Sequence, residues 1–206
     1  MTNYKAFFNL RKVGDRVLTG AQILRYSITD SPSQGDVVYL DKQHQDFSEN
    51  RKKAIQNPRI VMQRITGVDS KRRLVCTYIN NPCLCANSTN YISIDKSIDS
   101  LYLLGVLNST LINFFVRQTS TNTNITSQVI ASFPIINSKA QVQNSISVLT
   151  GEVLLAKRNG NETLALQKEK LIDLLIYHLY GLTYDEVLII DPETTITREE
   201  YEKKQN

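Results

Sequence analysis

The stretch Leu101–Arg117, LYLLGVLNSTLINFFVR, decides the fold of this chain. Its apolar residues surround a helix on most sides, and such a helix must lie between other elements. Polar and small residues interrupt the run, which also falls short of the roughly 20 apolar residues that span a bilayer. The stretch therefore predicts one buried core helix, capped by Asp99 or Ser100 and running to about Gln118.

Helical patterns continue towards the C-terminus. Ala140–Lys157 and Glu162–Tyr180 carry apolar residues at helical spacing with a short turn between them, which predicts an antiparallel helix pair. Thr183 and Glu186 have the spacing of a capping box, which predicts a further helix after the pair. Residues 191–206 are polar, and we expect this end of the chain to fray.

The first hundred residues predict a mainly β region. Arg59–Thr66 alternates with period two, as a strand does, and Leu74–Ile79 reads as the returning strand of a hairpin around the basic turn Gly67–Arg73. Asp36–Leu40 and Thr89–Ile94 predict two more strands. Short helices are expected over residues 19–26, where Thr19 and Gln22 form a capping box, and over residues 48–56.

The fold class that follows from these patterns is α+β, with a mixed, mainly β N-terminal lobe, a central buried helix and a C-terminal helical hairpin. A chain of 206 residues fits one domain or two small, tightly associated lobes. We therefore expect one lobe over residues 1–135, which includes the central helix, and a helical scaffold over residues 136–206, packed as one unit.

Charge is divided unevenly along the chain. Residues 1–73 hold 14 Lys/Arg and 7 Asp/Glu, a balance of +7, whereas residues 74–206 hold 10 and 13, a balance of −3. This asymmetry indicates that the first lobe faces a polyanion and that the second serves as a scaffold or protein contact. A solvated basic surface without a partner would have the same composition.

The cysteines predict free thiols in a reducing compartment. Cys76, Cys83 and Cys85 occur without an export signal, so we expect a cytoplasmic protein that is not attached to a membrane. A metal site would need a fourth ligand, such as His44, and the C-x-C spacing is not that of the usual zinc sites. We therefore predict no metal site.

Catalytic motifs are not evident. The segment Asn80-Asn81-Pro82-Cys83 lacks the second proline and the aromatic residue of an adenine methyltransferase loop. A compact nuclease would need clustered carboxylates with a lysine, whereas Asp95-Lys96 and Glu169-Lys170 are isolated pairs. His178 lies within a helical pattern and reads as a partly buried structural residue. We predict no catalytic residue in this chain.

Basic and amide side chains offer the chemistry that DNA binding needs, with cations for phosphates and paired donors and acceptors for base edges. They gather on the predicted hairpin and in the uncharged run at residues 118–128, which can enter a groove without a large desolvation cost. A solvated turn and a flexible linker would look the same. The candidate DNA-binding residues are Arg59, Arg64, Lys71, Arg72, Arg73, Asn122, Asn124 and Gln128.

Four parts of the chain, in order, resemble the TaqI-like C-terminal specificity domain of adenine-specific DNA methyltransferases and fused type II restriction-modification enzymes. They are Leu18–Tyr26, Asn57–Ile65, Leu103–Ser109 with the following Phe133-Pro134-Ile135, and Ile176–Val187. Each segment is modest by itself. Their order and spacing over about residues 18–190 make the resemblance specific.

This resemblance implies a target-recognition domain that does no chemistry itself. Its expected partners are double-stranded DNA, held with this half in the major groove, and the N-terminal methyltransferase domain of the same parent protein. We expect no cofactor in this chain and S-adenosylmethionine in the missing catalytic domain, so that the chain is the recognition half of a longer protein. Family motif residues such as Leu107, Asn108, Ser109 and Tyr180 are expected to be structural.

Other functions remain open from the sequence. A type I restriction enzyme specificity subunit uses a related recognition domain, and the chain could be a fragment of one. A protein-interaction module without DNA binding would also explain the acidic helical half, with the basic half incidental.

Overall fold

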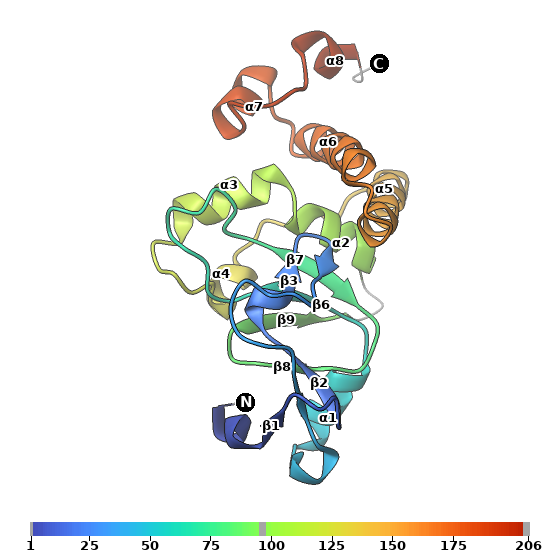
Figure 1. The fold of residues 1–206 in the computed structure, drawn as a ribbon. Helices are drawn as coiled ribbons and strands as arrows, with labels where there is room; N and C mark the ends of the chain where they lie inside the picture. The colour runs from blue at the N-terminus through green and yellow to red at the C-terminus, as the bar shows by residue number, and fades with distance from the viewer. Residues whose placement is uncertain (1, 95–97, 204–206) are drawn as a thin grey trace. The chain divides into compact units, whose positions relative to one another are not determined.

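The computed structural model describes residues 2–94 and 98–203 and confirms the α+β class (Figure 1). The chain forms two compact units, which we call the β unit, Met1–Lys96 with Asn122–Ser127, and the helical unit, Ser97–Thr121 with Gln128–Asn206. This division differs from the expected boundary at residue 135. The central helical region packs against the C-terminal helices, and the chain returns to the β unit only for a short segment.

A three-stranded antiparallel sheet forms the centre of the β unit, in the order β7-β6-β9. Its strands are β6 (Arg59–Gln63), β7 (Cys76–Ile79) and β9 (Thr89–Ser93). Ile60 lies opposite Tyr78 on one side and Ile92 on the other. The predicted hairpin is therefore confirmed, and β9 adds the third strand.

Burial along β6 departs from the sequence prediction. The sequence of residues 59–66 alternates with period two, but Arg59, Ile60, Val61 and Met62 are all buried. A strand that is buried on both faces needs no alternation of polar and apolar residues. Arg59 therefore lies in the interior of the β unit, which the local sequence pattern did not predict.

The remaining strands of the β unit are short. The four-stranded sheet has the order β1-β5-β2-β8, and β8 runs parallel to β2. Its strands are β1 (Phe8–Asn9), β2 (Asp15–Leu18), β5 (Val38–Leu40) and β8 (Leu84–Cys85); β3 (Ile23–Leu24) and β4 (Ser27–Ile28) form a separate hairpin. The helices of this unit are η1 (Thr2–Phe7), η2 (Gly20–Gln22), η3 (Lys42–His44) and α1 (Glu49–Gln56). The Thr19–Gln22 capping box is present, but the expected helix ends at Gln22 because β3 begins there.

The central apolar stretch forms two helices, so the prediction of one continuous helix was wrong. Helices α2 (Ser100–Leu107) and α3 (Thr110–Thr119) meet at a bend of 58°. The Ser109 hydroxyl accepts a hydrogen bond from Ile112 N at 3.2 Å and begins α3, as a helix N-cap does. No single helix in the described part of the chain is long and apolar enough to cross a membrane; only the bent α2–α3 pair meets those criteria of length and composition, and its residues are mostly buried.

Two long helices form the scaffold of the helical unit. Helices α5 (Ala140–Arg158) and α6 (Glu162–Leu179) confirm the predicted antiparallel pair. Helix α2 packs closely on α5 at Gly105, where an added Cβ would lie 2.5 Å from Thr150 Oγ1 and 2.9 Å from Ile146 Cγ2. A glycine is needed at this contact because any side chain would push the helices apart. The short helix α4 (Ser127–Ala131) precedes this pair.

The C-terminal segment is folded onto the helical unit, contrary to the expectation that it frays. Helices α7 (Tyr184–Ile190) and α8 (Arg198–Lys203) bury Ile196 and Tyr201 against Leu174 and Tyr177. The predicted capping box at the start of α7 is present. Within residues 191–203, only Ile196 and Tyr201 are buried apolar residues. The polar composition of the rest therefore led to the wrong prediction that the segment frays.

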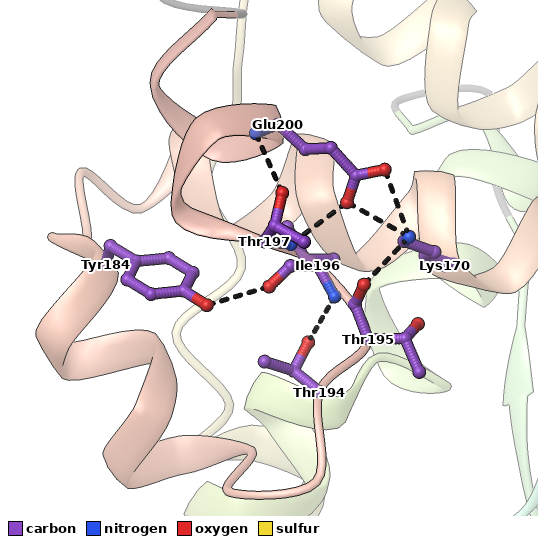
Figure 2. Close-up of polar contacts among 7 residues, drawn as sticks. All are labelled: Lys170, Tyr184, Thr194, Thr195, Ile196, Thr197 and Glu200. Carbon is purple, nitrogen blue, oxygen red and sulfur yellow. Dashed lines mark hydrogen bonds and ion pairs between the residues drawn. The ribbon is translucent and has the colours of Figure 1, made fainter.

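Polar contacts hold this segment in place (Figure 2). Lys170 on α6 donates to Thr195 O at 3.0 Å and forms an ion pair with Glu200 at 3.1 Å. The Glu200 carboxylate also accepts from Thr197 N at 2.9 Å, and Tyr184 OH donates to Ile196 O at 2.9 Å. The hydrogen bonds from Thr197, together with the one from Lys170, lower the pKa of Glu200.

Candidate nucleic-acid interface

The loop between β6 and β7 pairs with the segment that returns from the helical unit. Ile65 forms an antiparallel bridge with Asn124. Two backbone hydrogen bonds flank this bridge, Thr66 N to Thr123 O at 2.9 Å and Ile125 N to Arg64 O at 2.7 Å. Residues 64–73 and 122–125 thus form one structure, which we call the recognition ribbon.

Further contacts from the β unit hold the returning segment in place. Ile125 is fully buried, and its carbonyl accepts from Asn90 Nδ2 at 2.6 Å. Arg73 joins the two parts of the ribbon, since Nη2 donates to Asn122 O at 2.5 Å and Nε donates to Thr66 Oγ1 at 3.2 Å. Arg73 therefore connects segments that lie 49 positions apart in the sequence.

Two of the predicted DNA contacts are instead structural residues. Arg73 is fully buried between the parts of the ribbon, and Arg59 is only 2% exposed. The Arg59 guanidinium donates to the carbonyl groups of Ile55, Asn57 and Cys83. Neither guanidinium is accessible to a phosphate in this structure, so we revise the prediction for both.

The other predicted residues of the β unit lie on its surface. Arg64 is exposed and donates to Asn87 O at 3.3 Å. Lys71 is exposed, Arg72 is half-buried, and Asn122 and Asn124 are exposed. All five belong to the recognition ribbon, which brings cations and amides together. Gln128 is exposed on α4, where it lies in the helical unit and stays a separate prediction.

The division into units keeps the charge asymmetry seen along the sequence. By sequence, the β unit contains 15 Lys/Arg and 8 Asp/Glu, which gives +7, and the helical unit contains 9 and 12, which gives −3. The segment 122–127 contributes no charge. A positive unit with an exposed hairpin and neutral amides is suited to a polyanion whose surface also carries donors and acceptors.

A second polar cluster in the β unit contains two thiols and Arg59. Nη2 of Arg59 lies 3.3 Å from Cys83 Sγ and 4.0 Å from Cys85 Sγ. A hydrogen bond with the Cys83 thiol and the nearby charge of Arg59 lower the pKa of Cys85 to about 6, against the opposing effect of burial. The same hydrogen bond, together with burial, raises the pKa of Cys83. None of the three cysteines forms a disulfide, and no group of three potential metal ligands occurs within residues 2–94 and 98–203.

Sequence reasoning missed the contribution of Ile65 and Thr66 to this site. Ile65 is 57% exposed, whereas Thr66 is buried and accepts from Arg73. The period-two pattern of residues 59–66 contained this alternation. The segment that pairs with these residues, 122–125, is far away in the sequence. Its polar composition is typical of a loop, so the sequence did not predict the pairing.

Comparison with known proteins places these features in a family. The fold is similar to that in the structure of the type IIL restriction-modification enzyme MmeI in complex with DNA, with a TM-score of 0.60 and 15% sequence identity. The match covers 99% of this chain and 32% of the MmeI chain, so the protein spans about a third of that enzyme's length. No curated protein sequence matches the chain. The family described as the TaqI-like C-terminal specificity domain matches residues 15–135, more than half of the sequence, and the chain therefore belongs to this family.

Proposed function

We propose that this chain is the DNA target-recognition domain of an adenine-specific DNA methyltransferase or a fused restriction-modification enzyme. The observation that carries the proposal is the recognition ribbon, in which Arg64, Lys71 and Arg72 lie on the same structure as Asn122 and Asn124. Family membership and the likeness to a DNA-bound restriction-modification enzyme support it. In this proposal, the cations bind phosphates and the amides face base edges.

Catalysis belongs to a methyltransferase domain outside these 206 residues, which would bind S-adenosylmethionine. The residues of this chain do not fit an adenine or cofactor pocket at Asn81-Pro82, because this segment leads into Cys83, whose side chain is packed in the core. We therefore derive no catalytic step from this chain. The domain's contribution is to select the DNA sequence and to orient it.

The helical unit offers a surface for that catalytic domain. Val148 and Leu155 on α5 are 53% and 55% exposed, and Leu166 on α6 is 60% exposed. Val148 and Leu155 are seven positions apart and share one face of the helix. Exposed apolar side chains on a unit with a net charge of −3 favour a protein contact over a DNA contact.

The proposal is tested by the salt dependence of DNA binding. The chain should bind a fluorescent duplex at low salt, and its affinity should fall steeply between about 50 and 200 mM salt because phosphate contacts release counterions. Replacing both Lys71 and Arg72 with alanine should weaken binding to all sequences alike and reduce the salt slope by about 2, roughly one for each lost contact. Fluorescence anisotropy measures both quantities.

A matched variant controls for net charge. Lys139 and Arg158 are exposed in the helical unit, and the double alanine substitution there removes the same charge. It should leave the slope nearly unchanged. Binding no stronger than that of a neutral control protein would refute DNA recognition. Equal losses in the two double variants would show that the ribbon is not the contact surface.

A further inference from the structure

Two exposed side chains of the recognition ribbon lie directly beside each other. Ile65 is 57% exposed and Asn124 is also exposed, and they are bridge partners. The backbone hydrogen bonds that close the ribbon run between their neighbours, not between Ile65 and Asn124 themselves. In such a non-hydrogen-bonded pair the Cα atoms are about 4.5 Å apart and the side chains approach most closely.

The opposite face of the ribbon fixes which side chains point outward. Thr66 and Ile125 are buried, at 6% and 0% exposed, and they follow Ile65 and Asn124 in their respective strands. Successive side chains of a strand point to opposite faces, so a shift by one residue would bury Asn124 and expose Ile125. The register therefore presents one apolar group and one amide together.

These two groups match one base pair in the major groove. Adenine offers an acceptor at N7 and a donor at N6, which an asparagine amide can bind together, and thymine offers a methyl group for apolar contact. Both lie on the same groove edge of an A·T pair. The major groove also admits a two-stranded ribbon, the structure on which Ile65 and Asn124 lie.

We propose that the Ile65–Asn124 pair reads an A·T base pair in the major groove, with the Asn124 amide on adenine and the Ile65 side chain on the thymine methyl group. This inference rests on the proposed function and adds the bases that the ribbon selects. A phosphate does not explain the pairing as well, since an exposed isoleucine contributes nothing to a phosphate contact.

Selection from a randomised duplex library tests the pair. The chain, used at low salt, should enrich sequences with an A·T pair at one position, and Asn124→Ala should lose that preference by about tenfold while preferences elsewhere remain. On the enriched duplex, deoxyuridine in place of that thymine removes the methyl group. Wild-type affinity should fall roughly fourfold, the effect of burying one such group, whereas Ile65→Ala should not respond.

The analogue 7-deazaadenine removes the N7 acceptor and tests Asn124 in the same way. Wild-type binding should weaken and the Asn124→Ala variant should be insensitive, since a coupled pair shows non-additive losses. Val68→Ala, which changes another exposed apolar residue of the same hairpin, should respond to deoxyuridine like the wild type. Because these side chains are exposed, thermal unfolding of each variant should match the wild type.

The outcomes separate this inference from the proposed function. Two results would overturn the proposed base contact and leave DNA binding intact. One is salt-dependent binding without enrichment of an A·T pair. The other is an equal loss of affinity of the wild type and Ile65→Ala for the deoxyuridine duplex. An absence of binding to any duplex would overturn both.

Discussion

Cys85 is a half-buried thiol with a strongly lowered pKa. The hydrogen bond with Cys83 and the charge of Arg59 lower its pKa to about 6, so the thiolate predominates at neutral pH. Because the thiolate is the nucleophile, its alkylation by iodoacetamide should reach half its maximal rate near pH 6 rather than near pH 9, and should be lost as the pH falls below 6. Mass spectrometry of the labelled peptides from about pH 5 to 9 measures this rate.

Two comparisons make this measurement specific. Cys76 is fully buried, and burial raises the pKa of its thiol, so it should stay unlabelled in the folded protein. Cys83→Ala removes the hydrogen bond that lowers the pKa of Cys85 most strongly, and the midpoint should move upward. A midpoint that stays near pH 9 in the wild type would contradict the arrangement of Arg59 and the two thiols.

Arginine shows what single residues of this sequence could and could not reveal. The surplus of basic residues predicted the kind of partner, and Arg64 and Arg72 lie on the surface as expected. Arg59 and Arg73 are buried because carbonyl groups from distant segments accept their hydrogen bonds. The distant acceptors, Cys83 O for Arg59 and Asn122 O for Arg73, lie 24 and 49 positions away in the sequence, so a local reading treats all four arginines alike.

At the scale of elements, Arg73 holds the returning segment to the hairpin. Arg73→Lys keeps the charge but loses the two directed hydrogen bonds to Asn122 and Thr66. Each buried group left without its partner costs about 1–3 kcal/mol, so the free energy of unfolding should fall by roughly that amount. Urea unfolding measures the loss, and faster proteolysis within residues 118–128 should accompany it.

Arg64→Lys is the matched change for this prediction. Arg64 is exposed, and its guanidinium donates to Asn87 O at 3.3 Å. Its replacement should alter stability by less than about 0.5 kcal/mol, as for most surface changes. Equal losses for both variants would mean that Arg73 does not anchor the segment.

Elements with a strong local signal were predictable, and those that depend on a distant partner were not. The helices α5 and α6 and the α7 capping box follow from spacing and caps within the sequence. The break between α2 and α3 was missed because apolar residues continue on both sides of Asn108-Ser109, which concealed the N-cap role of Ser109. The segment at residues 122–125 has polar composition, and its extended pairing with the hairpin is a single bridge flanked by two backbone hydrogen bonds.

At the scale of the whole molecule, the two units differ in net charge and in the side chains that they expose. The β unit has a net charge of +7 and contains the ribbon, whereas the helical unit has −3 and exposes apolar side chains. Phosphate attraction should therefore concentrate on the β unit. The charge along the sequence predicted this division. It did not predict that residues 122–127 belong to the basic unit.

Hydrogen exchange with and without DNA tests this division. At low salt, a duplex should slow exchange of the loop amides at residues 67–72 and around residues 122–124, where bound phosphates and bases exclude water. The amides of α5 and α6 should be unaffected, because the acidic unit repels the duplex. Raising the salt to about 200 mM should remove the protection as binding weakens. Protection on α5 and α6 with none on the ribbon would reverse the assignment, since the DNA would then lie on the surface that we assign to the catalytic domain.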